Sequence, residues 1–590
     1  MLTVGGRAGS SPIPMSSRGI PGRTEERSMR NLIAFVWMFL LCGHLLSQTR
    51  LFRQQGKYVG EVVTWFVRPA GDVNGDGVGD FVYTSQPKKN SSMVLSLFSG
   101  LDGKPLFPLF GGKPLTTVWE PEGIGDVDGD GFGDLVYFAS TFNKTYEYWL
   151  AAYSPHLGKE LYRYRFSTYF NFRVGHRFQT LEVMEDVDGD GVKEILLGTG
   201  YGGSGAALIS GKTGKLIRYH RKVLGPIYDF GFTVRGIPDI DKDGVPDYLI
   251  SDPNFGGPPR YKLSWGKVWL YSGKTGKELC AFELGSNFRG GFFGGEGLAA
   301  LGDLNGDGWP DLGIQELDAW KYGRVWIYSG KEAAKGKAFT LTVLSGSFKK
   351  EALGLRLAPL GDWDGDGRDD FAAYAERWPG DHPKKDRYGL VHLYSGKTLK
   401  RFKTLQGQGN NGEGYGLILR PAGDLDGDGN VELLVGSDPR TINITKPEHF
   451  DIWTHKDLSL RTDRHLVSLS GIRLRTQTMR LDAGVKNAGR FYLLLGSLGG
   501  HKPGFRLGSL HVPLNPDAYF YWTATNGPNA LFLRSSFGQL DAKGRGMARF
   551  VLPAGMPPSL RWMTLWHSYV VLDARGFSMA SNAAPVLWSR

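Results

Sequence analysis

Carboxylate and amide side chains recur in this chain at a short fixed spacing that suits a hard metal cation. The pattern Asp-x-Asp/Asn-x-Asp-Gly-x-x-Asp/Glu begins seven times, at Asp72, Asp126, Asp186, Asp239, Asp303, Asp362 and Asp424, with starts 53 to 64 residues apart. Side-chain oxygens at positions 1, 3, 5 and 9, with the backbone carbonyl of position 7, can surround one ion in a tight turn. Ca²⁺ takes about six to eight oxygen ligands in irregular geometry, so it fits this set better than Mg²⁺.

The predicted metal ligands are the residues at positions 1, 3, 5, 7 and 9 of each copy, so the sequence predicts up to seven calcium ions. In chain order they are Asp72, Asn74, Asp76, Val78, Asp80, Asp126, Asp128, Asp130, Phe132, Asp134, Asp186, Asp188, Asp190, Val192, Glu194, Asp239, Asp241, Asp243, Val245, Asp247, Asp303, Asn305, Asp307, Trp309, Asp311, Asp362, Asp364, Asp366, Arg368, Asp370, Asp424, Asp426, Asp428, Asn430 and Glu432. No Cys or His lies within a copy, which argues against zinc or copper.

Two simpler interpretations of the pattern are weaker. An EF-hand needs a bidentate Glu at position 12 and flanking helices. Position 12 is instead apolar or aromatic, as in Tyr83 and Leu197, and lies in short apolar runs typical of buried strands. Ordinary Asp/Gly turns would not repeat so regularly over seven copies. Lys242 at position 4 and Arg368 at position 7 are expected to weaken the fourth and sixth sites.

A second motif, Ser-Gly-Lys, follows most copies, as at Ser272-Gly273-Lys274 and Ser395-Gly396-Lys397. Each unit then reads strand, metal loop, strand, variable loop, strand, Ser-Gly-Lys turn, strand. Four antiparallel strands repeated about every 59 residues predict a β-propeller. We therefore predict an all-β chain, with a seven-bladed β-propeller with calcium-binding loops over residues 49–471. Residues 466–471 echo the turn motif in the last blade, and closure is expected to borrow a strand from residues 56–67.

Short β-like runs without a metal motif continue through residues 472–590, and their spacing predicts a small C-terminal β-sandwich-like domain. Residues 1–48 are interpreted as an N-terminal extension and signal peptide. The apolar run at residues 32–41 follows Arg27 and Arg30, is short for a membrane span, and makes Met29 the expected start. Since Cys42 falls in this leader, Cys280 is left without a partner for an internal disulfide.

With these features the chain resembles the FG-GAP repeat family, the N-terminal repeats of integrin α subunits, and is similar to secreted bacterial propeller proteins of that type. The resemblance covers roughly residues 50–470. It depends on loops such as Gly302 to Asp311 and on the Phe230-Gly231 and Phe293-Gly294 pairs. It implies calcium, secretion and a platform for binding, but no particular ligand. Dockerins and thrombospondin type 3 repeats use similar loops without strand-filled gaps of this length.

Charge is divided unevenly along the chain. The seven loops hold 27 of the 59 acidic residues but only three of the 70 Lys and Arg. The loops are therefore acidic, and the rest of the chain is strongly basic. A basic surface attracts polyanions such as acidic polysaccharide, although the same charge can serve solubility alone. We expect an acidic glycan or a surface protein as partner, no specific nucleic acid, no membrane span once the leader is removed, and a monomeric propeller. The expected location is secreted, periplasmic or at the cell surface.

Loops between the second and third strands combine cations with aromatic rings that can stack on sugars. The candidate ligand-binding residues are Arg260, Trp265, Trp320, Arg377, Trp378, Lys384 and Lys385. No nucleophile elbow, His-Glu-x-x-His or phosphate loop occurs, so no catalytic residue is assigned. We predict a calcium-binding, secreted binding or adhesion protein. A polysaccharide lyase or hydrolase on the same scaffold and a structural envelope component are the alternatives.

Overall fold

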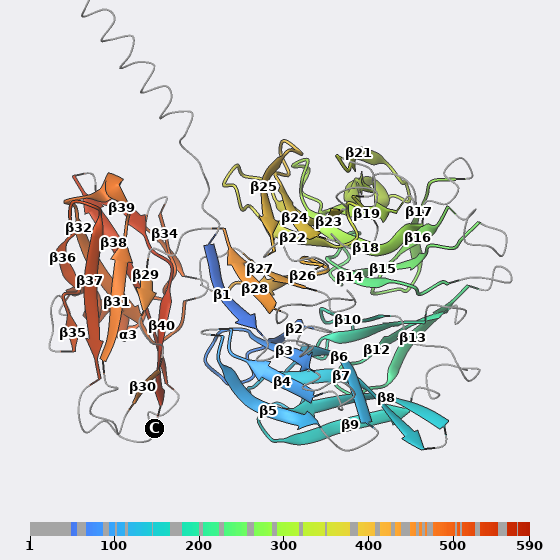
Figure 1. Ribbon diagram of the computed structural model, residues 1–590, viewed down its shortest axis with the longest axis horizontal. Helices are drawn as coiled ribbons and strands as arrows, with labels where there is room; N and C mark the ends of the chain where they lie inside the picture. The colour runs from blue at the N-terminus through green and yellow to red at the C-terminus, as the bar shows by residue number, and fades with distance from the viewer. Residues whose placement is uncertain are drawn as a thin grey trace, which may run out of the picture. The chain divides into compact units, whose positions relative to one another are not determined.

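Antiparallel β-sheets make up most of the protein in a computed structural model (Figure 1). The structure describes residues 49–55, 67–85, 94–100, 103–111, 116–143, 145–165, 180–199, 205–222, 229–256, 265–285, 292–317, 323–347, 351–377, 388–407, 414–425, 431–437, 449–455, 460–462, 466–468, 476–501, 504–507, 510–525, 532–552, 563–574 and 576–589. Helices are few and short among these residues: α2 (Gly330–Ala333), α3 (Ala518–Thr525) and the 3₁₀ helix η3 (Val485–Asn487).

The described residues up to Thr454 form seven four-stranded sheets, as the repeated unit predicts. Sheet by sheet the strands are β2 (Val67–Gly71), β3 (Asp80–Ser85), β4 (Val94–Phe98) and β5 (Pro105–Gly111); β6 (Thr116–Gly125), β7 (Asp134–Asn143), β8 (Thr145–Ser154) and β9 (Lys159–Arg165); β10 (Thr180–Met184), β11 (Glu194–Gly198), β12 (Gly205–Ile209) and β13 (Leu216–Arg221); β14 (Val234–Ile237), β15 (Asp247–Asp252), β16 (Lys267–Tyr271) and β17 (Glu278–Glu283); β18 (Phe293–Gly302), β19 (Asp311–Glu316), β20 (Arg324–Tyr328) and β21 (Thr340–Ser345); β22 (Leu357–Gly361), β23 (Asp370–Arg377), β24 (Tyr388–Tyr394) and β25 (Arg401–Gln406); and β26 (Ile418–Gly423), β27 (Glu432–Gly436) and β28 (His449–Thr454) with β1 (Thr49–Gln55).

Each metal loop connects the first and second strands of its sheet. In the third sheet Met184 pairs with Glu194, so the hairpin between them brackets the loop. The second strand is apolar because both of its faces are covered: Ile195 and Leu197 enter one buried cluster, and Leu196 enters another. Strands buried on two faces read as continuous apolar runs. The hydrophobic cores therefore lie between neighbouring sheets and hold the loop ends in place.

The first strands of the seven sheets contact one another in chain order, and β26 also contacts β2. In the last sheet the fourth strand is supplied by β1, which pairs antiparallel with β28. This strand lies before residues 56–67, from which the sequence predicted the closing strand; residues 56–66 lie outside the described residues. The arrangement of all-β, four-stranded sheets is consistent with a propeller (Figure 1).

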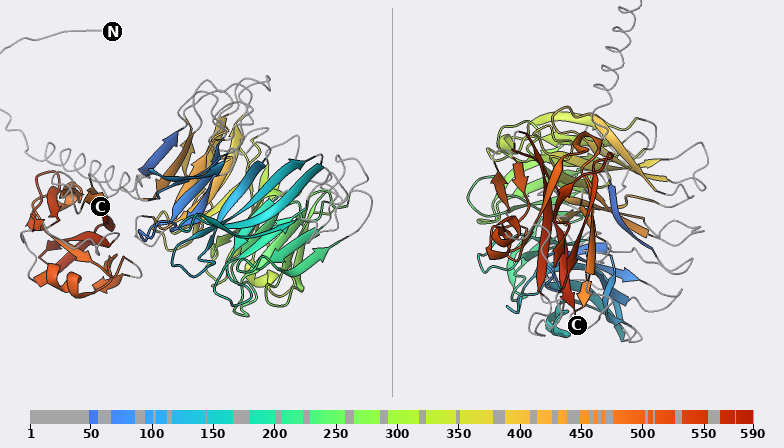
Figure 2. Two further views of the ribbon diagram at one scale, coloured as in Figure 1. Left: turned by 90° about the horizontal axis from the view of Figure 1, so that it is seen from below. Right: turned by 90° about the vertical axis from the view of Figure 1, so that its left-hand side faces the viewer.

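The C-terminal strands form two further sheets around one apolar core that includes Leu481, Phe550, Leu494 and Tyr569 (Figure 2). One sheet is β29 (Leu460–Thr462), β31 (Thr476–Asp482), β37 (Arg545–Val551) and β35 (Leu533–Arg534); the other is β30 (Leu466–Ser468), β40 (Ala584–Ser589), β38 (Thr564–Asp573), β32 (Phe491–Ser497), β36 (Phe537–Gln539) and β39 (Gly576–Ala580), with β33 (Phe505–Leu507) and β34 (Leu510–Val512) as a separate hairpin.

The chain around residue 466 differs from the sequence prediction. Residues 466–471 were expected to form the turn of the seventh repeat, but β30 pairs parallel with β40 and β29 pairs with β31. Residues 460–462 and 466–468 therefore join the C-terminal sheets, because the fourth strand of the seventh sheet is already provided by β1. Helix α3 was not predicted either. No helix among the described residues is long and apolar enough to cross a membrane.

Candidate metal centres

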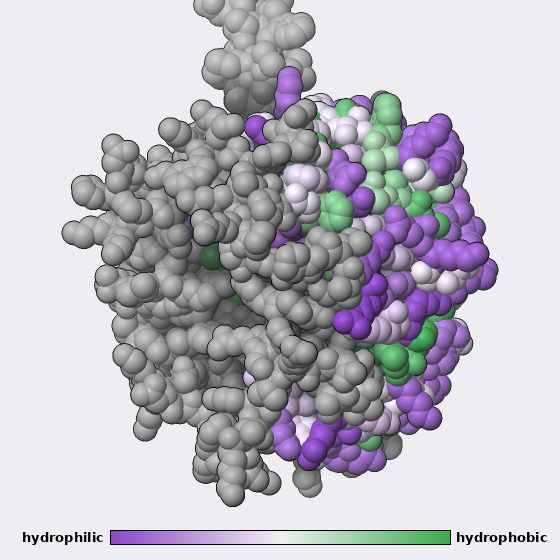
Figure 3. Space-filling view, turned by 90° about the vertical axis from the view of Figure 1, so that its right-hand side faces the viewer, coloured by the Kyte–Doolittle hydropathy of each residue, from purple (hydrophilic) through white to green (hydrophobic). Residues whose placement is uncertain are grey.

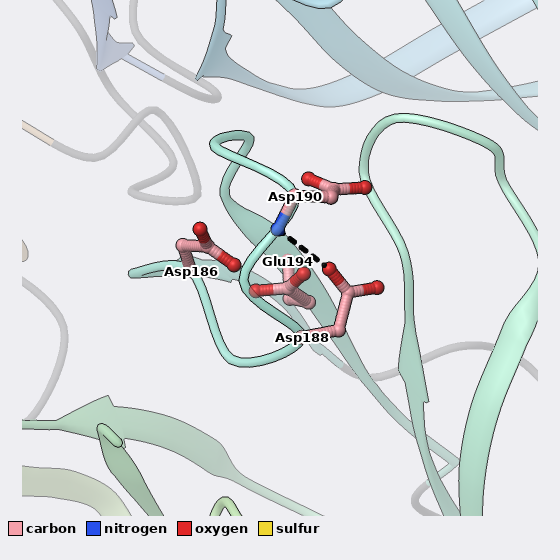
Figure 4. Close-up of side chains that lie close together, drawn as sticks. All are labelled: Asp186, Asp188, Asp190 and Glu194. Atoms are coloured by element: carbon pink, nitrogen blue, oxygen red, sulfur yellow. Dashed lines mark hydrogen bonds between the residues drawn. The ribbon is translucent and has the colours of Figure 1, made fainter. Parts of the chain in front are cut away.

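The third loop, between β10 and β11, illustrates how the acidic pattern folds. Asp186, Asp188, Asp190 and Glu194 surround a common centre, and one carboxylate oxygen from each lies within 4.8 Å of the others (Figure 4). Glu194 is the first residue of β11, so the hairpin fixes where the last of the four carboxylates stands. Four carboxylates this close repel one another, and a bound divalent cation removes that penalty.

Backbone N–H groups orient these carboxylates. Gly189 and Gly191 donate to the two oxygens of Asp186 at 2.7 and 2.8 Å, and Asp190 donates through its N–H to Asp188 Oδ1 at 3.2 Å (Figure 4). The φ angles of the two glycines are 82° and 86°, which a residue with a side chain adopts only with strain. The glycines therefore permit the tight turn that gathers the carboxylates.

The other loops share this geometry. In six loops the position-6 N–H donates to the position-1 carboxylate at 2.8 to 3.0 Å, the donors being Gly77, Gly131, Gly191, Gly244, Gly308 and Gly367. Three more groups of carboxylate oxygens lie within 4.8 Å of one another: Asp126, Asp128 and Asp134; Asp239, Asp241 and Asp243; and Asp362, Asp364 and Asp370. In the seventh loop, positions 3 to 7 lie outside the described residues.

The position-9 carboxylates, from Asp80 to Glu432, are all buried. Burial, reinforced by neighbouring carboxylates of the same loop, raises the pKa of Asp80 to about 9, that of Glu194 to about 8 and that of Asp311 to about 7. Glu194 Oε1 and Asp311 Oδ2 have no hydrogen-bond partner within the described part of the chain. A buried oxygen without a partner is costly, and a bound cation would supply one.

The donor set in these loops suits a hard divalent cation. Carboxylates, the amides of Asn74 and Asn305 and backbone carbonyls provide oxygen, whereas the thiolate and imidazole donors favoured by zinc and copper are absent from the loop sequences. The side chains at positions 1, 3, 5 and 9 would hold the ion. The acidic clusters therefore fit divalent metal binding.

The Ser-Gly-Lys turns, which the sequence predicted only as hairpins, contact the metal loops directly. Lys274 Nζ donates to the Asp243 carbonyl at 2.9 Å, and the Gly273 N–H donates to Asp247 Oδ1 at 2.9 Å. Equivalent bonds join Lys212 to Asp190, Lys397 to Asp366, Gly100 to Asp80, Gly330 to Asp311 and Gly396 to Asp370. These turns therefore hold the position-5 residue through its carbonyl and the position-9 residue through its carboxylate.

Glycine is required in these turns because two backbones approach closely. A β-carbon on Gly273 would lie 1.8 Å from the Pro246 carbonyl oxygen, and one on Gly396 would lie 1.9 Å from that of Asp369. Both carbonyls belong to position 8 of the metal loop in the same sheet. The recurrence of Ser-Gly-Lys after successive loops was the available sequence signal for this contact.

Loops of neighbouring sheets also contact one another. Gly133 of the second loop donates to the Asp72 carbonyl of the first at 2.7 Å, and Trp309 Nε1 of the fifth donates to the Ile240 carbonyl of the fourth at 3.2 Å. Lys242, which was expected to weaken its own loop, extends toward the next loop instead. Lys242 Nζ lies 3.3 Å from the centre of the Trp309 ring in the next loop. The metal loops therefore form a series of linked sites.

A second set of charged residues lies on the first strands, each four residues before a metal loop: Arg68, Glu122, Glu182, Arg235 and Arg420. Arg235 and Arg420 donate to the two oxygens of Glu182, Arg420 at 2.8 Å, although Arg420 belongs to the seventh sheet and Glu182 to the third. Burial favours the neutral acid, but the two guanidinium groups outweigh it and lower the pKa of Glu182. No sequence prediction included this cluster.

The candidate ligand-binding residues of the variable loops remain a prediction, because most of them lie outside the part of the chain that the structure describes. Arg260, Trp320, Trp378, Lys384 and Lys385 lie outside the described residues, and Arg377 ends β23. Trp265 packs edge-on against Phe255, with ring centroids 6.4 Å apart. On the face in Figure 3, hydrophilic side chains predominate among the described residues, with small apolar areas between them.

Parts of the chain are similar to integrin α subunits. It is 28% identical to integrin alpha-4 of Xenopus laevis over 205 residues, 27% identical to integrin alpha-V of Gallus gallus over 260 residues and 33% identical to integrin alpha-7 of Homo sapiens over 147 residues. These matches cover 32%, 39% and 23% of this chain but only 19%, 24% and 12% of the integrins. The chain thus spans less than a quarter of the length of these relatives. No protein-family profile matches it. The similarity supports an integrin α-like repeat.

Proposed function

We propose that this protein is a secreted calcium-binding β-propeller that acts in binding or adhesion. The observation that carries the proposal is the repeated oxygen cage, in which buried position-9 carboxylates such as Glu194 and Asp311 keep an oxygen without a hydrogen-bond partner among the described residues. Ca²⁺ suits a set of four side-chain oxygens and a carbonyl better than Mg²⁺, which gives up its waters reluctantly. Up to seven ions bind, one in each loop.

The scaffold in this proposal is a closed ring of seven blades over residues 49–455. Closure is supported by β1, which completes the last sheet beside β28, and by the contact between β26 and β2. The bond from Arg420 to Glu182 joins the seventh sheet to the third, as expected when strands face a common axis. The C-terminal domain then begins near residue 460, with β29, rather than at 472.

Calcium binding can be tested by isothermal titration of the full chain with Ca²⁺ and with Mg²⁺ after chelation. The proposal predicts calcium binding at several sites, lost in part when Asp126 and Asp130 are replaced by Asn. Asp482→Asn is a matched control, because Asp482 is half-exposed, ends β31 of the C-terminal sheets and pairs with Arg545. Absence of calcium heat in the wild-type protein, or equal loss in Asp482→Asn, would contradict the proposal.

The proposed ligand is an acidic polysaccharide or another polar surface ligand. The support is the formal net charge of +11, the concentration of acidic residues in the metal loops, and the hydrophilic described surface of Figure 3. Retention of the protein on acidic and neutral polysaccharides, with calcium or with chelator, tests this part. Calcium-dependent retention on the acidic polymers without their cleavage supports it, whereas equal passage through all columns contradicts it.

A further inference from the structure

Large side chains at position 7 of one metal loop lie over position 4 of the preceding loop. Phe132 of the second loop lies against Gly75 of the first, where a β-carbon would come within 2.7 Å of the ring. Trp309 of the fifth loop lies beneath the Lys242 ammonium of the fourth. The residue at position 7 therefore offers its carbonyl to its own site and its side chain to the neighbouring site.

Arg368 of the sixth loop makes this contact with the fifth loop. A β-carbon on Gly306 would lie 1.8 Å from both Nη atoms of Arg368, so the guanidinium covers position 4. Arg368 Nη1 also lies 3.9 Å from Asp303 Oδ2, which is a side chain expected to bind the ion of the fifth site. Among the position-7 residues of the seven copies, Arg368 is the one that carries charge.

The fifth loop has less negative charge than most with which to offset this guanidinium. Position 3 is Asn305, so three carboxylates remain within the loop, and Asp369 of the sixth loop accepts a hydrogen bond from the Asp303 N–H at 2.8 Å. Lys331 Nζ lies 5.0 Å from the centre of the Trp309 ring, which adds a second cation at the same loop. The Lys242 ammonium of the fourth loop lies over the same ring, 3.3 Å from its centre, and adds a third cation beside the fifth loop.

We propose that Arg368 is a resident cation of the fifth site and makes that site the weakest for calcium. This inference rests on the proposed calcium sites. The positive guanidinium beside Asp303 opposes a divalent ion there by Coulomb repulsion, which is moderated by solvent because the Arg368 side chain is 36% exposed. One residue thereby supplies a carbonyl ligand to the sixth site and a competing charge to the fifth.

A ligand variant allows the fifth site to be followed separately. Tb³⁺ is a luminescent calcium analogue, and the Trp309 indole, which extends from the fifth loop to the fourth, can sensitise it at both loops. The experiment titrates Tb³⁺ into the full chain, displaces it with Ca²⁺, and assigns the fifth site as the component lost when the position-5 ligand is changed in Asp307→Asn. Wild type is compared with Arg368→Gln, Arg368→Met and the charge-conserving Arg368→Lys. Lys335→Gln removes one positive charge from an exposed site on the helical turn as a matched control.

The account predicts that Arg368→Gln and Arg368→Met tighten calcium binding in the Asp307-dependent component by about fivefold, and that added salt shrinks this difference. Arg368→Lys and Lys335→Gln should leave it near the wild-type value. Unchanged or weaker binding in both neutral variants overturns the role of Arg368 while leaving the calcium sites standing. A wild-type protein from which Ca²⁺ displaces no Tb³⁺ overturns the metal sites themselves.

Discussion

Two regions of this protein bury carboxylates and compensate them in opposite ways. On the first strands, Glu182 receives hydrogen bonds from Arg235 and Arg420, and its pKa falls despite burial. In the neighbouring metal loop, Glu194 is as deeply buried but receives one backbone N–H, from Val187, and its pKa rises to about 8. The chain thus provides guanidinium groups for Glu182 and not for Glu194.

This difference indicates what each region requires. An acid paired with two arginines is neutralised by the fold itself, whereas Glu194 keeps one oxygen without a partner in the described part of the protein. Buried charge that the chain leaves uncompensated is expected where a ligand supplies the opposite charge. Glu194 and its metal loop therefore depend on a cation from solution, whereas Glu182 does not.

The largest expected effect comes from Glu182→Gln. This change leaves the Arg235 and Arg420 guanidinium groups buried without their shared carboxylate, which should cost about 3 kcal/mol in the free energy of unfolding. Denaturant melts should give the same loss with calcium and with chelator. Glu278→Gln, at an exposed pair with Lys222, should cost nearly nothing. A loss that appears only with calcium would break the contrast between the two regions.

The matched change in the loop, Glu194→Gln, should behave differently. Without calcium the buried carboxyl, with its pKa raised to about 8, is mostly protonated at neutral pH, so the amide replaces a neutral group of similar shape and stability should stay the same or rise. With calcium at about 100 times its dissociation constant, loss of one site should cost about 2.7 kcal/mol of stabilisation. Thermal melts of the variant in both conditions measure this. Equal destabilisation with and without calcium would mean that Glu194 has a structural role alone.

The pH dependence sharpens the contrast further. The folded pKa values of the position-9 carboxyls in the first six loops, from about 6 for Asp247 to about 9 for Asp80, exceed their unfolded values near 4. In the metal-free protein their contribution to stability is therefore full below about pH 4 and is lost as the pH rises through the folded pKa values. Calcium offsets the charge of the ionised carboxylates.

The increase in melting temperature on adding calcium should consequently grow between about pH 5 and about pH 8, and binding should release protons in that range. Paired melts in calcium and in chelator at each pH measure the first effect. Titrations in buffers of different ionisation enthalpy measure the second. A calcium gain that is largest at acid pH would contradict the assignment of these carboxyls as ligands.

The smallest expected effect is at the supporting turns. Lys274→Met removes the hydrogen bond to the Asp243 carbonyl and should cost about 1 kcal/mol, with weaker calcium binding at the fourth site. Lys277→Met, in the same turn, is the control. Calorimetric titration and melts of both variants test this, and identical behaviour would remove the supporting role of the Ser-Gly-Lys motif.

Much of the fold could be predicted from the sequence because the repeat is local. The loop that starts at Asp186 and the apolar run after Glu194 lie within one hairpin, so their spacing predicts both the loop and the strand. The contact between Lys274 and Asp243 could not be predicted, since it depends on how two hairpins of one sheet pack. The β1 strand was missed because its partner lies some 400 residues later in the chain.

Contacts between sheets explain the remaining differences. Arg368 was expected to weaken its own loop, but a side chain at position 7 leaves its turn and reaches the preceding loop. Arg420 and Glu182 are single charges in otherwise unremarkable strands, and only their common place four residues before each motif links them. Charged residues at the same position of successive repeats, such as these, are recognised only when the repeats are aligned with one another.

The most direct test of the account is a crystal structure of the protein grown with calcium, with anomalous scattering data collected to locate the ions. The account predicts peaks inside the loops, about 2.3 to 2.6 Å from carboxylate oxygens such as those of Asp186 and Glu194, with the weakest peak in the loop of Asp303 beneath Arg368. Well-ordered loops without such peaks, at calcium concentrations well above those outside cells, would contradict the claim that these carboxylates are metal ligands.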